Sequence, residues 1–149
     1  MNTQIKVKIK KLSETAHLPT YGSEGAAGAD LYALTDSDIT IEPGRTLMIR
    51  TGIALEIPVG YVGLVFARSG LASKRGLAPA NKVGVIDSDY RGEIMVALHN
   101  HSDMPQTLTP GERVAQIAVM PCCQAIFETV TSLDDTDRGE GGFGSTGRS

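Results

Sequence analysis

Short runs of apolar and alternating residues fill the middle of the chain, from residue 39 to about residue 125. Clear examples are residues 47–57, 61–66 and 114–120, with turn-forming prolines and glycines between them. Runs of this length that end at proline or glycine are typical of β-strands, and no part of the chain has the period of a long helix. The pattern predicts an all-β protein, a sandwich or barrel of many short strands.

The start of the chain also alternates. Ile5, Val7 and Ile9 are separated by lysines, which predicts a half-exposed strand. This segment lacks the continuous apolar stretch of a signal peptide, and no run in the sequence approaches the length of a membrane span. We therefore expect no membrane partner.

One short helix is predicted after Arg68. Ser69 is a suitable N-cap, residues 71–75 can form about one turn, and Gly76 can end it. The exposed N–H groups at such a helix start favour an anion, with the Arg68 guanidinium and the Ser69 hydroxyl as further donors. Taken alone, this pattern is common at the start of surface helices.

The composition is that of a folded protein of one domain. The chain has 149 residues, of which 41% are hydrophobic and 21% charged. Its net charge of −3 provides no overall basic field, so we expect no nucleic-acid partner and a local site for any anionic ligand. The adjacent Cys122 and Cys123 cannot link distant parts of a fold. We expect them to be buried or half-buried strand thiols in a reducing cytoplasm.

Residues 81–98 carry the densest set of polar groups. Two apolar runs flank the turn sequence Ser-Asp-Tyr-Arg-Gly, which predicts a β-hairpin in which Asp87 begins the turn and Tyr90 caps it. Where the two arms of such a hairpin separate, unpaired backbone N–H and C=O groups can form hydrogen bonds with the edge of a nucleobase. Taken alone, Asp87 and Asp89 are ordinary turn formers.

Two polar residues stand in strands that look buried. An unpaired charge on Asp30 would be costly there, and a metal ion or a bound water would relieve the cost. Gln116 requires partners for its amide. Neighbouring backbone or a ligand can supply them, and the spacing does not distinguish these two readings.

The last segment, residues 138–147, has five glycines in ten residues around Phe143. Its composition is typical of a disordered tail. An arginine, a Ser-Thr pair and many unhindered N–H groups could nevertheless wrap a triphosphate. The segment is not a Walker loop, because no lysine follows the last glycine.

Five segments together resemble a known family. Residues 27–31, 68–70, 84–92, 110–116 and 138–147 read AGADL, RSG, GVIDSDYRG, PGERVAQ and RGEGGFGSTG. In this order they are similar to the five motifs of the trimeric dUTPases. Each match is modest alone, but five in order cover nearly the whole chain.

The resemblance implies a fold and an assembly. The family fold is a distorted jelly-roll of short antiparallel strands. Here it would comprise a β-rich core of residues 1–137 with one short helix, and a flexible arm of residues 138–149 that closes over the active site. The family forms homotrimers with active sites at subunit interfaces. The hairpin comes from one chain, the Arg-Ser-Gly segment from a second and the glycine-rich tail from the third.

The resemblance also implies an activity. Such enzymes hydrolyse dUTP to dUMP and pyrophosphate by in-line attack of water on the α-phosphorus, which limits uracil in DNA and supplies dUMP for thymidylate synthesis. The cofactor would be Mg²⁺, bound chiefly by the triphosphate and reached by Asp30 through water. The alternatives are a dCTP deaminase-like enzyme and a dUTP-binding regulatory module.

Roles for individual residues follow from the resemblance alone. Asp87 would orient and deprotonate the water and bind the 3′-hydroxyl, with Asp30 and Gln116 completing the catalytic set. Tyr90 would pack under the deoxyribose and exclude a 2′-hydroxyl, and Phe143 would stack over uracil. The remaining contacts would be Asn81, Gly84, Val85, Ile86 and Met95 to uracil, Arg68, Ser69, Gly70 and Gln116 to the phosphates, and Arg138, Gly144, Ser145 and Thr146 to the γ-phosphate.

Overall fold

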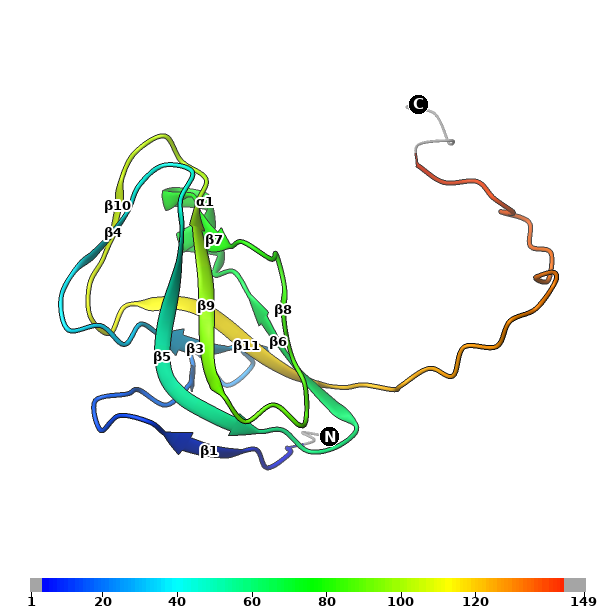
Figure 1. Cartoon of the computed structure of the whole chain (residues 1–149), viewed down its shortest axis with the longest axis horizontal. Helices are drawn as coiled ribbons and strands as arrows, with labels where there is room; N and C mark the ends of the chain where they lie inside the picture. The colour runs from blue at the N-terminus through cyan, green and yellow to red at the C-terminus, as the bar shows by residue number, and fades with distance from the viewer. Residues whose placement is uncertain (1–3, 144–149) are drawn as a thin grey trace.

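Antiparallel strands make up most of the ordered body of the chain in a computed structural model that describes residues 4–143 (Figure 1). Eleven strands and one helix occur in these residues. In chain order they are β1 (Lys8–Lys11), β2 (Thr20–Tyr21), β3 (Ala29–Tyr32), β4 (Ile39–Ile41), β5 (Thr46–Glu56), β6 (Tyr61–Phe66), α1 (Ser69–Arg75), β7 (Leu77–Pro79), β8 (Gly84–Ile86), β9 (Glu93–Asn100), β10 (Gln106–Leu108) and β11 (Arg113–Pro121).

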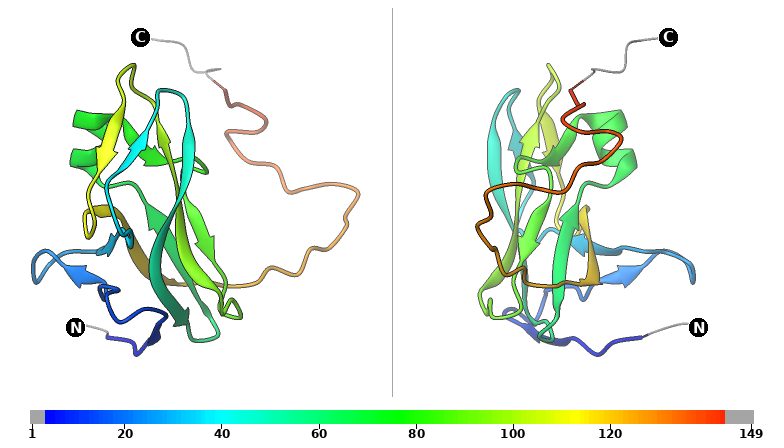
Figure 2. Two further views of the ribbon diagram at one scale, coloured as in Figure 1. Left: turned by 60° about the vertical axis from the view of Figure 1, so that its left-hand side comes forward. Right: turned by 90° about the vertical axis from the view of Figure 1, so that its right-hand side faces the viewer.

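The strands form three sheets, in which every pairing is antiparallel. One sheet has the order β1-β5-β9-β7, the second has the order β2-β3-β11-β6-β8, and β10 pairs with β4 in a small third sheet. The two larger sheets face each other across the body of the protein (Figure 2). The prediction of an all-β jelly-roll of short antiparallel strands with one short helix is confirmed.

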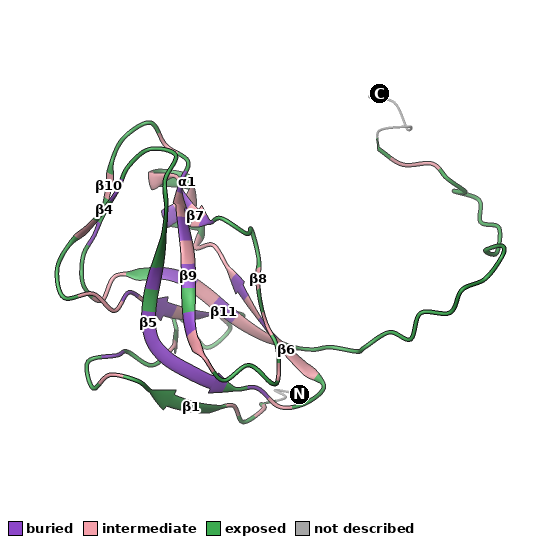
Figure 3. Cartoon of the chain, in the orientation of Figure 1, coloured by how far each residue is buried: buried purple, intermediate pink, exposed green. Residues whose placement is uncertain are grey.

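The core lies between the two larger sheets and consists of aliphatic side chains (Figure 3). Strand β9 shows how the sequence pattern builds it, because Ile94, Val96 and Leu98 are each at most 2% exposed while the residues between them are not buried. Such alternation places one face of a strand in the core. Each fully buried side chain of this size contributes about 1.5–3 kcal/mol.

Strand bounds agree closely with the sequence pattern. Strand β6 covers residues 61–66 as predicted, and β5 (residues 46–56) and β11 (residues 113–121) differ by one residue at each end from the predicted runs 47–57 and 114–120. Gly44, Gly60 and Gly111 have φ values of 70°, 86° and 75°, which explains the glycines at these turns. At the start of the chain the predicted strand is limited to β1, whose four residues are all exposed and which, among the residues that the structure describes, pairs with β5 alone.

Helix α1 begins earlier than predicted and without the predicted cap. Its N-cap is Arg68 in an extended conformation, and no side chain caps the helix, so the prediction of Ser69 as N-cap is wrong. The Arg68 side chain donates a hydrogen bond to Asp30 of β3 instead, which ties the start of the helix to that strand. Gly76 ends the helix as predicted, with a φ of 66° and its N–H donating to the Ala72 carbonyl.

The segment predicted as a hairpin crosses between two sheets. Strand β8 pairs with β6 in the five-stranded sheet, whereas β9 pairs with β5 and β7 in the four-stranded sheet. The hairpin prediction is therefore wrong in its pairing, although both arms are strands. The arms separate because each finds a partner in its own sheet, and this separation opens the cavity described below.

The chain leaves the body after β11. Both cysteines follow this strand and are exposed, so the expectation of buried or half-buried strand thiols is wrong. Residues 122–143 contain no helix or strand and run away from the two large sheets (Figure 1). Ile126 and Phe127 on this arm are 98% and 95% exposed. Nowhere in residues 4–143 is there a helix long and apolar enough to cross a membrane.

Candidate functional site

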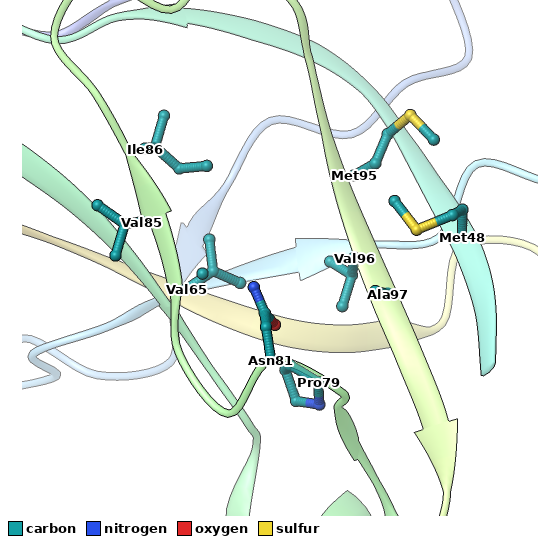
Figure 4. A pocket seen from close by; sticks show the side chains of 10 residues that line it. Met48, Val65, Pro79, Asn81, Val85, Ile86, Met95, Val96 and Ala97 are labelled. Carbon is teal, nitrogen blue, oxygen red and sulfur yellow. The ribbon is translucent and has the colours of Figure 1, made fainter. Parts of the chain in front are cut away.

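A cavity of about 140 Å³ lies between β8 and β9 (Figure 4). All five residues that the sequence predicted for a base site lie around it. Further residues from β5, β6, β7 and β9 complete the walls, and these were not predicted. The lining residues are Met48, Val65, Pro79, Asn81, Gly84, Val85, Ile86, Met95, Val96 and Ala97.

The walls of this cavity suit a flat, mostly apolar ligand with a polar edge. Met48, Met95 and Val96 supply apolar side chains, and the Asn81 amide lies beside Val65 on another wall of the cavity (Figure 4). Strand β8 is the last strand of its sheet, so one of its edges keeps backbone donors and acceptors free. At Gly84 an added Cβ would lie 3.2 Å from the Cβ of Val65, which would narrow the cavity.

The loop between β8 and β9 carries Asp87 and Tyr90. The Tyr90 N–H donates to the Asp87 carbonyl over 3.2 Å, so Tyr90 closes the turn that Asp87 begins, as the sequence predicts. The Tyr90 hydroxyl donates to the Glu93 carbonyl over 3.0 Å, which ties the ring to the start of β9. Asp87 lies beside the cavity, because it follows Ile86 of the lining directly.

Asp87 also lines a second, larger hollow of about 640 Å³. Val85 borders both hollows, so β8 separates them. The other walls are the loop after Asp87, the turn before β6, the start of β6 and the chain just after β11. The Asp87 carboxylate is exposed here and open to water and to a ligand.

A separate polar cluster surrounds Asp30 on β3. Its carboxylate receives Arg68 Nε at 2.7 Å and Arg113 Nη1 at 3.3 Å, and its side chain is only 13% exposed. Two guanidinium groups thus offset the charge that looked unpaired in the sequence, so a metal ion is not required for that purpose. Arg113 was missed at the sequence level, although it lies three residues before Gln116 in the same motif.

Gln116 joins this cluster from β11. It pairs with Asp30 of β3 on one side and with Phe66 of β6 on the other. Its Nε2 donates to the Ala67 carbonyl over 2.8 Å, so the backbone-partner reading holds for that end of the amide. An added Cβ on Gly28 would lie 2.5 Å from Oε1 of Gln116, which shows how closely the backbone of the first motif approaches this side chain.

The predicted site residues therefore form two groups within one chain. The cavity and the loop bring together the predicted base and sugar residues, and the cluster brings together Asp30, Arg68 and Gln116. Ser69 and Gly70 are exposed beside the cluster at the start of α1. Among residues 4–143, no hydrogen bond joins Asp87 or Tyr90 to the Asp30 cluster.

The predicted tail residues lie far along the arm. Arg138 Nε donates to the Gly141 carbonyl over 2.7 Å, and Phe143 is fully exposed with a φ of 51°. The segment that carries them, residues 122–143, runs away from the two large sheets of the same chain (Figures 1 and 2). Gly144, Ser145 and Thr146 fall outside the described residues.

Two pKa values are displaced outside these groups. Lys8 lowers the pKa of Glu56, first through a hydrogen bond and then through its charge. Desolvation of the ring, followed by His99 and Lys82, lowers the pKa of His101. In the part of the chain that the structure covers, no three His, Cys, Asp or Glu side chains form a group that could hold a metal ion.

Known proteins resemble this chain over nearly its full length. The dUTPase family model matches residues 14–147. A deoxyuridine 5′-triphosphate nucleotidohydrolase of Syntrophotalea carbinolica is 50% identical over 143 residues, covering 96% of this chain and 97% of that protein. One from Desulfitobacterium hafniense is 53% identical over 146 residues, with the same coverage.

Solved structures agree in fold. A mutant dUTPase of Staphylococcus bacteriophage 80alpha with dUpNHpp has a TM-score of 0.87 at 28% identity, covering 99% of this chain and all of that one. A mutant dUTPase of phage phi11 of S. aureus, whose structure describes the coordination of a structural Mg(II) ion, has a TM-score of 0.75 at 25% identity, covering 86% and 98%. With the match across residues 14–147, these likenesses show that the chain belongs to the dUTPase family.

Proposed function

We propose that this protein hydrolyses dUTP to dUMP and pyrophosphate. The observation that carries the proposal is the cavity between β8 and β9, which is lined by all five residues expected to contact uracil. Relatives that are 50% and 53% identical in sequence are deoxyuridine 5′-triphosphate nucleotidohydrolases. A neighbouring structure holds dUpNHpp, a ligand of the same nucleotide type.

Uracil would bind edge-on to β8. The free edge of that strand supplies backbone donors and acceptors, which can pair with the N3–H and carbonyl groups of the base, and the Asn81 amide can add another bond. Met48, Met95 and Val96 would cover the ring. In so small a cavity the 5-methyl group of thymine would meet the apolar walls, so dTTP would bind poorly.

Tyr90 would select the sugar. Its ring is held at the loop by the hydrogen bond to the Glu93 carbonyl and would pack under the deoxyribose. A ring in that place leaves no space for a 2′-hydroxyl, so UTP would be rejected on steric grounds. The exposed Asp87 carboxylate beside the cavity would accept a hydrogen bond from the 3′-hydroxyl.

Asp87 would also act as the general base. It would hold a water in line with the α-phosphorus and take its proton as the new P–O bond forms and the bond to the bridging oxygen breaks. Pyrophosphate would leave with the bonding pair. Arg68, Gln116 and the backbone N–H groups of Ser69 and Gly70 would stabilise the negative charge on the phosphates.

The residues present fit Mg²⁺ held mainly by the substrate. Asp30 offers oxygen donors, and residues 4–143 contain no protein cage of three ligands. Mg²⁺ commonly keeps several waters and binds through one or two carboxylates plus substrate phosphates. Asp30 would therefore reach the ion through water. When bound, Mg²⁺ would neutralise charge on the triphosphate.

The complete site would need three chains. Within one chain the base cavity and the Asp30 cluster share no hydrogen bond among the described residues, so a second chain would supply the phosphate contacts. The arm would come from the third. Its exposed Ile126 and Phe127 favour packing on a neighbouring subunit. Residues 138–149, with Arg138, Phe143, Gly144, Ser145 and Thr146, would then close the site.

Pyrophosphate release from dUTP, dTTP, dCTP and UTP in Mg²⁺ tests this function. We expect rapid release from dUTP and turnover at least about a hundredfold slower with the other nucleotides. Ammonia release from dCTP would instead identify a deaminase. Tight binding of dUTP without any product would identify a regulatory module.

A further inference from the structure

Two histidines meet at the end of β9. The rings of His99 and His101 lie with their centroids 4.4 Å apart and their planes at 62°, an edge-to-face arrangement. His99 is the last residue but one of β9 and His101 directly follows the strand, so both rings come from the same end of β9. The chain has three histidines, and the third, His17, lies against Tyr32 at 5.1 Å.

One of the two rings is held in a fixed orientation. His99 Nδ1 lies 2.8 Å from the Thr46 hydroxyl, on the residue that faces His99 across β5 and β9. This bond occupies Nδ1 and leaves Nε2 of the half-buried ring for another partner. Histidines that bind metals usually use their second nitrogen in just such a bond, which orients the ring.

The second ring is exposed, but its backbone is anchored. The His101 N–H donates to the Gly76 carbonyl over 2.8 Å, beside the end of α1. The ring thus stays next to His99 while remaining open to solvent. An ion in solution can therefore reach the exposed ring of His101, which lies beside the half-buried ring of His99.

We infer that His99 and His101 form a two-histidine site for a first-row transition-metal ion such as Ni²⁺ or Zn²⁺. Neutral imidazole is a preferred ligand of these ions, at about 2.0–2.1 Å for Zn²⁺, whereas Mg²⁺ prefers oxygen. Water would fill the other positions, since no third His, Cys, Asp or Glu completes a group within the described residues. The site is separate from Asp30, the residue proposed to face Mg²⁺.

Two features of the surroundings determine the affinity that we expect for the metal ion. Two protein ligands with open positions and the positive charge of nearby Lys82 favour micromolar rather than nanomolar binding. Binding should also raise the melting temperature, because the ion binds only the folded chain.

Calorimetric titration with NiCl₂ at pH 7.5 tests the site, using the full chain with Cys122→Ser and Cys123→Ser so that no thiol competes. Excess Mg²⁺ is added to the sample so that it occupies any metal site formed by oxygen ligands. We expect one Ni²⁺ per chain, and His99→Gln and His101→Gln should each weaken binding roughly tenfold or more. His17→Gln is the matched control and should change nothing.

The same samples provide a readout that does not depend on a variant folding well. In imidazole NMR spectra of the protein with all three histidines, Ni²⁺ should broaden the signals of His99 and His101 and spare His17. Unchanged binding in the double variant His99→Gln/His101→Gln would overturn the inference. Loss of binding in only one single variant would show one isolated ligand and would overturn it equally.

Discussion

The ring of Tyr90 lies directly over Gly92. An added Cβ at position 92 would come 2.6 Å from Cζ of the ring and even closer to its hydroxyl oxygen. The same hydroxyl donates to the Glu93 carbonyl over 3.0 Å. The position of the ring therefore depends on the absence of a side chain two residues later.

Gly92→Ala should accordingly damage sugar selection. The new methyl group must push the Tyr90 ring away from its place under the sugar, and the 2′-hydroxyl of UTP should then fit there. We expect the ratio of kcat/KM for dUTP over UTP to fall roughly tenfold or more. Steady-state kinetics with both nucleotides measures this ratio. Gly25→Ala is the control, because nothing lies within 4 Å of its added Cβ, and an equal change there would rule out the steric explanation.

Asp87→Asn should separate binding from chemistry. The amide can still accept a hydrogen bond from the 3′-hydroxyl but cannot take a proton from water. We expect kcat to fall about a hundredfold or more, with dUTP still bound within a few-fold of the native affinity. Single-turnover kinetics measures the rate of the chemical step, and calorimetry with dUpNHpp measures the affinity for the nucleotide. Asp89→Asn is the matched control in the same loop, and near-normal turnover by Asp87→Asn would remove Asp87 from the role of base.

Arg113→Ala should weaken catalysis more than stability. Arg113 is half exposed, so its ion pair with Asp30 should contribute no more than about 1 kcal/mol to folding. Its loss nevertheless frees one side of the Asp30 carboxylate, and we expect kcat/KM to fall several-fold. Urea unfolding and kinetics on the same sample provide the comparison. Lys8→Ala, which removes the exposed pair with Glu56, should alter neither quantity, and equal losses in both variants would contradict the idea.

Asn100→Ala should be among the more damaging changes to the fold. The side chain is fully buried, and its Nδ2 donates to the carbonyls of Ile41 at 2.9 Å and Met104 at 2.8 Å, while Oδ1 accepts from Ser102. Alanine would remove these hydrogen bonds from a fully buried position, so we expect a loss of about 2–4 kcal/mol in the free energy of unfolding. Urea denaturation measures it. Asn81→Ala, on an exposed residue, should leave stability almost unchanged, and a similar loss there would refute the argument.

Alternation and turn residues were enough to predict most strands. The 61–66 run matches β6 because tyrosine, valine and phenylalanine favour a pleated, half-buried surface, and the proline and glycine just before it mark its start. The partners of β8 and β9 could not be predicted in this way. A local pattern favours pairing between neighbours, whereas here each strand bonds a distant one, and only tertiary contacts decide between the two.

The sequence predicted many of the residues of the candidate site, but it did not predict all of the side chains that they contact. Resemblance supplied Asn81, Gly84 and Met95, which the structure brings around one cavity. It did not supply Met48, which reaches the cavity from β5 through a register that no local pattern encodes. Nor did it supply Arg113. An arginine at an exposed strand position is common on any protein surface, and only the structure shows that this one pairs with Asp30.

Two truncations should separate closure from assembly. Deleting residues 138–149 removes Arg138 and Phe143 but keeps the exposed Ile126 and Phe127. If the tail closes the site, turnover of dUTP should fall about a hundredfold or more while the mass in solution remains that of a trimer. Light scattering and kinetics on one preparation measure both.

Deleting residues 126–149 should in addition weaken the trimer, because it removes the apolar side chains that need a neighbouring subunit to cover them. The longer truncation should dissociate at protein concentrations where the shorter one stays assembled. Full activity in the shorter form would mean that the tail does not act on the site. Equal trimer stability in both forms would mean that Ile126 and Phe127 do not pack on a neighbour, and the exposed arm would then need another explanation.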